Sequence, residues 1–102
     1  MLADKMRSDL EEYAKIQSGD PVTEPLFDAA VQLAESATGK RFEVENGEPK
    51  SQLYWLAIKQ IVIHWYDNRG AVSEKSLENI PLSANELLNH IALSSDFSGV
   101  SG

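Results

Sequence analysis

The sequence predicts an all-α fold, a small four-helix domain around one long apolar helix, with two long loops. The first observation is the segment 49–69, which is apolar on nearly every side at helical spacing and carries both tryptophans. The second is that three shorter segments repeat their apolar residues at helical spacing between turn and capping residues. A chain of 102 residues forms one domain with one core.

The first two helices are expected at residues 2–17 and 23–38, where apolar residues recur three or four positions apart. The turn sequence 18–21 ends the first helix. Thr23 is expected to cap the second helix, and Gly39 to take the left-handed conformation just past its end. The buried stripe of the second helix includes alanines that allow a close approach to a neighbouring helix: Ala30, Ala34 and Ala37.

Residues 40–48 lack helical periodicity and form either a short strand or an arm, with Asn46-Gly47 as a turn signal. Pro49 is expected to open the central helix and Gly70 to close it. Its polar residues fall on one narrow strip: Gln52, Lys59, Gln60, His64 and Asp67. This helix therefore needs cover on most sides, from other helices or from other copies of the chain.

The second long connection, residues 71–80, carries apolar residues among charges, so we expect it to dock on another surface. The last helix is expected at 83–93. Ser83 and Glu86 match a capping box, and Leu82 with Leu87 matches the hydrophobic staple across it.

The domain is expected to span residues 1–93, followed by a flexible tail at 94–102 that is rich in serine and glycine.

Catalytic and metal-binding patterns are not found in the sequence. There is no cysteine, no glycine-rich phosphate loop and no nucleophile motif. His64, Asp67 and His90 are the candidates for a metal site. Zinc needs at least three well-placed protein ligands, so His64 and Asp67 are better explained as solvated members of the polar strip of the central helix. We therefore expect no enzyme activity, no metal and no cofactor.

The formal net charge is −7, and its excess lies in the first part of the chain. Residues 1–39 contain three basic residues against eight acids: Asp4, Asp9, Glu11, Glu12, Asp20, Glu24, Asp28 and Glu35. Such a surface repels phosphate and disfavours tight binding to nucleic acid, although it also serves simply for solubility. The N-terminus has no apolar signal region, and no apolar run is long enough to span a membrane.

Three pieces of sequence together point to a family. They are Ala-Thr-Gly-Lys-Arg-Phe at 37–42, Ile58 to Arg69 with its ending His-Trp-Tyr-Asp-Asn-Arg, and Ile-Pro at 80–81 before a short helix with Leu87-Leu88. Over residues 23–93, in order and spacing, the chain resembles the head–tail connector proteins of long-tailed bacteriophages, also called head-completion or adaptor proteins.

The resemblance implies an all-α protomer that forms a ring of about a dozen copies joined head to tail. It implies a place in the virion between the portal protein and a tail-proximal head-completion or tail protein. DNA passes through the ring without specific binding, and no membrane is involved. The chain would be synthesised in the host cytoplasm.

Two sets of residues are candidates within such a ring. Structural or interface roles are expected for Trp55, Trp65, Tyr66, Arg69, Val72, Leu77 and Ile80, and the second helix and the 71–80 loop are expected at the subunit contact. A place on the channel wall is expected for Glu11, Glu12, Asp28 and Glu35. Arg69 is expected to stabilise the end of the central helix, where a cation interacts favourably with the dipole.

The alternative is a small helical regulatory or partner-binding protein without catalytic activity. A basic recognition helix would favour a DNA-binding regulator, but the basic residues of this chain are scattered.

Overall fold

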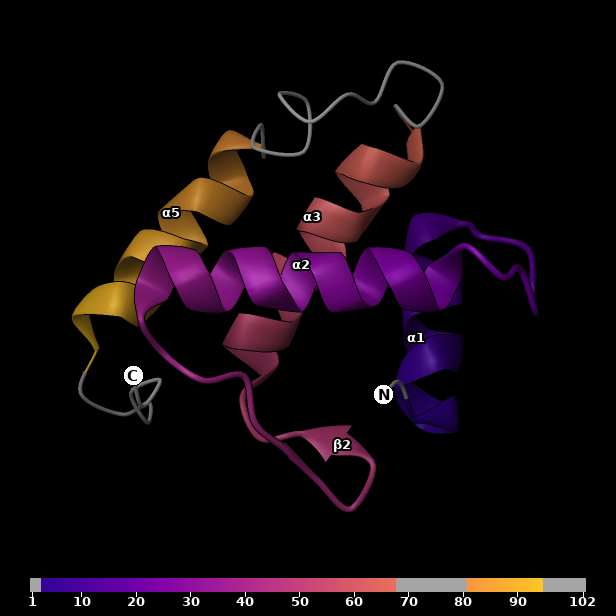
Figure 1. The fold of residues 1–102 in the computed structure, drawn as a ribbon, viewed down its shortest axis with the longest axis horizontal. Coiled ribbons are helices and arrows are strands. Elements are labelled where there is room, and N and C mark those ends of the chain that lie inside the picture. The colour runs from indigo at the N-terminus through magenta and orange to yellow at the C-terminus, as the bar shows by residue number, and fades with distance from the viewer. Residues whose placement is uncertain (1–2, 68–80, 95–102) are drawn as a thin grey trace.

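The computed structural model describes residues 3–67 and 81–94 (Figure 1). This part of the chain is a compact and mostly helical domain with a small two-stranded sheet. Its elements are α1 (Asp4–Ala14), α2 (Thr23–Thr38), β1 (Val44–Glu45), β2 (Glu48–Pro49), α3 (Gln52–Asp67) and α5 (Leu82–Leu93). The four expected helices are thus present in the described residues, and the sheet is an addition.

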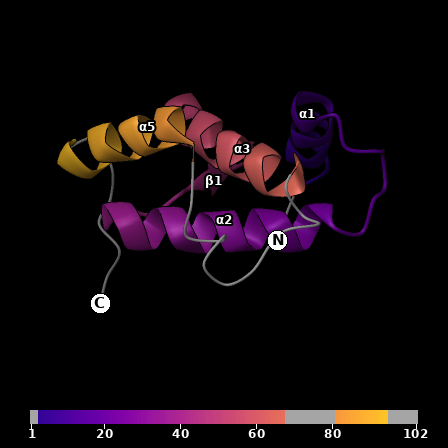
Figure 2. The same ribbon diagram turned by 90° about the horizontal axis from the view of Figure 1, so that it is seen from above.

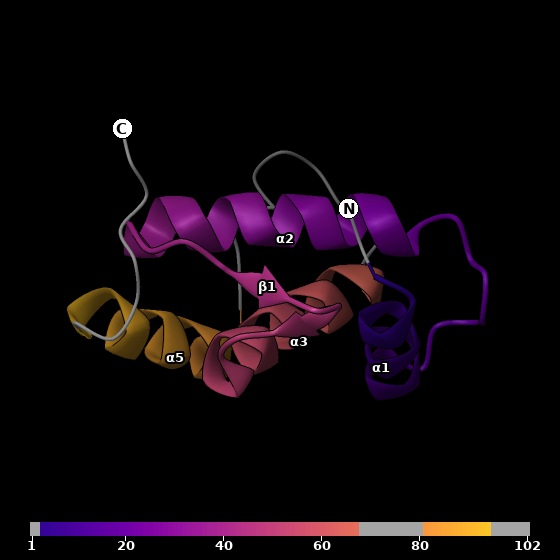
Figure 3. The same ribbon diagram turned by 90° about the horizontal axis from the view of Figure 1, so that it is seen from below.

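The helices form two layers. Helix α2 alone makes one layer, and it crosses the other layer, in which α3 lies between α1 and α5 (Figures 2 and 3). Helix α3 contacts all three of the other helices, and α2 also contacts α1 and α5. Helix α3 is apolar on nearly every side, and α1, α5 and the crossing helix α2 cover these sides.

The core lies where these helices meet. Helix α3 contributes the most buried side chains: Tyr54, Trp55, Ala57, Ile58, Ile61, Val62 and Trp65. From α2, Ala30 and Ala34 are fully buried, and their small side chains permit its close approach. Ala37, expected on the same stripe, is exposed instead. At one end of the core, Phe42 packs against the rings of Phe27, Tyr54 and Trp55, and Phe27 also packs against Trp55, with centroids 5.3–6.3 Å apart.

The C-terminal ends of α1 and α2 both use a left-handed residue. Gly39 follows α2 with φ of 69°, as predicted, and its N–H donates to the Glu35 carbonyl. Helix α1 ends earlier than predicted, at Ala14, because Lys15 takes φ of 57° and the Ile16 N–H donates to the Glu11 carbonyl. This bond completes a Schellman motif and turns Ile16 back into the core.

The predicted N-terminal capping is wrong at two helices. Thr23 is not the cap of α2, because it already lies in the helix with its side chain fully buried. Asp20 instead accepts a hydrogen bond from the Val22 N–H at 3.0 Å and shapes the turn before the helix. At α5 the capping box does not form, since the Ser83 hydroxyl donates to Gln60 of α3. Leu82, the expected staple residue, is 72% exposed.

The start of α3 also differs from the prediction. Pro49 belongs to β2, so it does not open the helix. Ser51 takes that place, because its hydroxyl accepts a hydrogen bond from the Tyr54 N–H at 3.1 Å. The two residues of the turn signal, Asn46 and Gly47, both have positive φ and join β1 to β2 in an antiparallel hairpin, with Glu45 opposite Glu48.

Candidate interaction surfaces

The aromatic residues expected to have structural or interface roles are largely internal to the protomer. Trp55 and Trp65 are each 2% exposed, and Tyr66 is partly buried against the core. The tryptophans are therefore core residues that hold α3 against its neighbours. Arg69, Val72, Leu77 and Ile80 lie outside the described residues, as do the rest of the 71–80 loop and the tail from residue 95 onward. Their roles stay predictions.

The four acids expected on a channel wall occupy different environments. Glu12 and Asp28 are exposed, on α1 and α2 respectively. Glu35 is partly buried, and its carboxylate accepts a hydrogen bond from the Phe42 N–H at 2.9 Å. Glu11 is only 7% exposed, and its carboxylate accepts from the Gly19 N–H at 3.1 Å. Glu11 and Glu35 thus hold loops inside the protomer, which leaves Glu12 and Asp28 as accessible charges.

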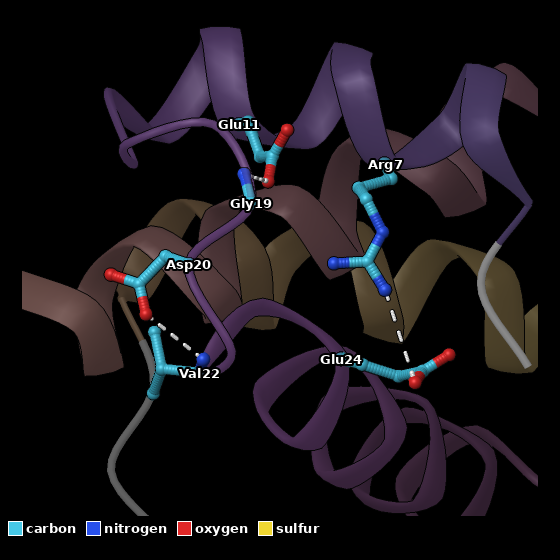
Figure 4. Close-up of polar contacts among 6 residues, drawn as sticks. All are labelled: Arg7, Glu11, Gly19, Asp20, Val22 and Glu24. Carbon is cyan, nitrogen blue, oxygen red and sulfur yellow. Dashed lines mark hydrogen bonds and ion pairs between the residues drawn. The ribbon is translucent and has the colours of Figure 1, made fainter.

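The polar contacts around the α1–α2 connection appear together in Figure 4. Glu11 fixes the connection at Gly19, and the Asp20 side chain fixes its last turn at Val22. Arg7 of α1 reaches Glu24 at the start of α2, with 3.8 Å between guanidinium nitrogen and carboxylate oxygen. This connection is therefore anchored at both ends, which sets the angle between α1 and α2.

A second polar anchor joins α1 to α3 and was not predicted from the sequence. One carboxylate oxygen of Asp9 accepts from the Trp55 indole N–H at 2.7 Å and from the Lys59 ammonium at 3.0 Å. The ammonium also lies 4.8 Å from the centroid of the Tyr13 ring and 5.5 Å from that of Trp55. Partial burial opposes ionisation of Asp9, but the two hydrogen bonds and the charge of Lys59 outweigh it and lower the pKa of this carboxyl.

A third polar cluster ties the end of α2 to α3. The Tyr54 hydroxyl donates to the Lys40 carbonyl at 2.7 Å and lies 3.2 Å from the Thr38 hydroxyl. Thr38 in turn donates to the Ala34 carbonyl. Burial raises the pKa of Tyr54, despite the hydrogen bond with Thr38, and the charge of Glu35 adds to this increase.

The described surface has open hollows, and two of them lie beside α2 and α1, respectively. The larger one, about 400 Å³, lies between α2 and the start of the hairpin. We call it the α2 groove, and it is lined by Phe27, Asp28, Val31, Gln32, Phe42 and Val44. The smaller, about 200 Å³, lies between α1, the hairpin and the start of α3. Neither hollow brings together a nucleophile, a base and an oxyanion site of the kind that catalysis requires.

Exposed apolar side chains point to contact surfaces. Among the described residues the large ones are Tyr13, Val44, Leu82 and Leu93. Tyr13 is explained by the Lys59 ammonium over its ring. Leu82 and Leu93, 72% and 89% exposed, lie at the two ends of α5.

Metal sites and membrane-spanning helices are both absent from the described residues. Across residues 3–67 and 81–94, no three His, Asp or Glu side chains gather closely enough to hold a metal ion, and this includes His64, Asp67 and His90. In the same part of the chain, no helix has the length and hydropathy needed to cross a bilayer.

Comparison with known proteins gives a match to a protein family. A family model described as "Phage gp6-like head-tail connector protein" matches residues 9–91, from the middle of α1 to the last turns of α5. No curated protein and no solved structure matches the chain. The match covers most of the chain and confirms the resemblance that the sequence indicated.

Proposed function

Because the chain belongs to the phage gp6-like head–tail connector family, we propose that it assembles into a closed ring of about twelve copies between the portal and the tail. Membership makes it a structural phage protein of the head–tail region, in a family that is not known for enzymes. The ring would complete the head and leave a passage for DNA. The single observation that carries this proposal is the family match across residues 9–91.

The protomer has features that suit such a role. Its helices are fixed to one another by buried aromatic packing and by three polar anchors, at Glu11, Asp9 and Tyr54. A rigid protomer supports a ring because each copy must present its two contact surfaces at one fixed angle for the ring to close. The exposed leucines of α5 and the α2 groove are surfaces that contacts could cover.

The acidic surface suits a passage for DNA. Non-specific DNA binding depends on cations that replace condensed counterions, and the net charge of −7 works against it. Of the four acids expected on the channel wall, we retain Glu12 for this role, because it is exposed and, unlike Asp28, does not line the α2 groove. Repulsion between the wall and the phosphates would let DNA slide without adhering.

Mass measurement of the purified chain over a wide concentration range tests the ring directly. We expect oligomers that converge on one closed size. If free copies stay monomeric, the oligomer should form once portal-bearing heads are added. The same chain should restore tail attachment to heads that lack a connector. A strict monomer at all concentrations that also fails to bind such heads would contradict the proposal and favour a small regulatory or partner-binding protein.

Charge reversal tests the channel assignment separately. The variant Glu12→Lys should still assemble into particles, but DNA exit should be slower. The matched control is Glu45→Lys, which makes the same change in net charge at another exposed acid. Equal slowing in both variants, or none in either, would refute a specific role for Glu12.

A further inference from the structure

Helix α5 presents a continuous exposed stripe. Leu82 and Leu93 are eleven residues apart, which is about 1100° of rotation, so they lie within about 20° of each other around the helix and about 16 Å apart along it. Glu86 and Asn89 fall between them on the same side, and both are exposed. We call these four residues the α5 stripe. The stripe thus offers an exposed leucine at each end and two exposed polar side chains between them.

The α2 groove has matching chemistry. Four apolar side chains line it, Phe27 and Val31 on α2, Val44 on β1, and Phe42 just before β1. Two polar side chains, Asp28 and Gln32, lie one helical turn apart on α2 and are exposed. The α5 stripe likewise carries two polar residues one turn apart, between apolar ends.

We propose that the α5 stripe of one copy packs into the α2 groove of the next copy, antiparallel to α2. This inference rests on the proposed ring and names the two surfaces that would join its subunits. The orientation follows from charge. An antiparallel arrangement places the Asn89 amide at the Asp28 carboxylate and the Gln32 amide at Glu86, whereas a parallel one places Glu86 against Asp28 and the two carboxylates repel.

A second copy is the occupant that fits best because one chain carries both halves of the contact on different elements. Surfaces of that kind produce heterologous, head-to-tail contacts, which close into rings. Pairing of two α5 stripes with each other would instead stop at two copies and leave every α2 groove open. The groove already holds the acceptor Asp28 and the amide Gln32, which are complementary to the two polar groups of the stripe.

The size of the contact predicts weak association of free copies. The stripe is about 16 Å long and about 10 Å wide, so it buries much less than the roughly 800 Å² per partner of a standard stable interface. In a closed ring each copy is held by two such contacts, and the second forms at high effective concentration. We therefore expect cooperative closure with few intermediate sizes.

Cysteine cross-linking tests the contact without background, since the chain has no cysteine. The variants Asp28→Cys and Asn89→Cys each change one exposed residue. When they are mixed and oxidised under conditions where the ring forms, a mixed dimer should be the main product. A mixture of Asp28→Cys with Ser18→Cys, an exposed residue of the α1–α2 connection, is the control and should give little. A mixed dimer of Glu86→Cys with Asn89→Cys in place of the expected one would mean that α5 stripes pair with each other, which overturns the proposal.

A charge swap tests the assigned partners. Asn89→Asp should weaken ring formation at least tenfold, because it sets a second carboxylate at Asp28. Adding Asp28→Asn in the same chain exchanges the two groups and should restore assembly, which a merely structural effect of Asn89→Asp would not allow. The melting temperature of each variant, measured below the concentration of assembly, should match the unmodified chain.

The ring and the subunit contact can be refuted separately. If the unmodified chain forms rings but shows neither the cross-link nor the rescue, the contact assigned here is wrong and the ring stands. If it forms no ring alone or on heads, the proposed function fails and this inference fails with it.

Discussion

Replacement of Asp9 by alanine should destabilise the protomer through the anchor between α1 and α3. The Trp55 side chain is almost wholly buried, and its indole N–H donates to Asp9 at 2.7 Å. Removal of the acceptor leaves that buried donor unpaired, which costs about 1–3 kcal/mol of the free energy of unfolding. The Lys59 ammonium loses its ion pair but keeps its contacts with the rings of Tyr13 and Trp55, so we add little for it.

For a domain of this size, 1 kcal/mol corresponds to roughly 4–8 °C in melting temperature, so a loss of about 1–3 kcal/mol should make Asp9→Ala melt roughly 4–24 °C lower. Asp9→Asn keeps an oxygen that can accept from Trp55 and should lose only about 1 kcal/mol. Glu12→Ala is the matched control, because Glu12 is an exposed acid on the same helix. Thermal and urea unfolding, followed by the fluorescence of the two tryptophans, measure all three variants at several protein concentrations.

The pH dependence gives an independent check. The pKa of Asp9 is lowered in the folded state, so its stabilising effect is complete above the unfolded-state value of about 3.9 and is lost as the pH falls through the lowered pKa. The difference between the unmodified chain and Asp9→Asn should therefore shrink in acid. If Asp9→Ala and Glu12→Ala melt together within about 2 °C, less than the shift expected for 1 kcal/mol, the anchor carries no appreciable energy and this reasoning is refuted.

Three further predictions follow from single contacts. Lys15→Gly should raise the free energy of unfolding by about 1 kcal/mol, because Lys15 has φ of 57°, and Lys15→Ala, which keeps a Cβ, should not. Thr23→Val should also raise it by about 1 kcal/mol, because the fully buried Thr23 hydroxyl has no hydrogen-bond partner among the described residues; a loss of stability would show that this hydroxyl is satisfied. Tyr54→Phe should lower it by about 1 kcal/mol at neutral pH. The pKa of Tyr54 is raised by burial, so the unmodified chain should lose stability as the pH rises above about 10, and urea titrations at pH 9–11 should show that this loss is smaller in Tyr54→Phe.

The sequence by itself determined the helical segments and the family. Helix α2 has the predicted bounds because periodicity and the glycine after it are local signals, and Gly39 takes the left-handed conformation that only its lack of a Cβ makes easy. The Asn46-Gly47 turn is equally local, since both residues need positive φ. The ending of α3 and the spacing of the other motifs identified the family that the match over 9–91 then confirmed.

Only the tertiary structure decided which polar side chains are used inside the fold. Glu11 and Glu12 are neighbours in sequence, yet Glu11 is buried and accepts a hydrogen bond from the Gly19 N–H, whereas Glu12 is exposed. Asp9 meets Trp55 across 46 positions of chain, and no local pattern encodes such a pair. Ser83 matched a capping motif, but a partner on α3 took its hydroxyl instead. Periodicity reports which face of a helix turns inward, whereas the partners of a buried polar group depend on how separate helices pack, because desolvation makes each such group bond to whichever neighbour lies within reach.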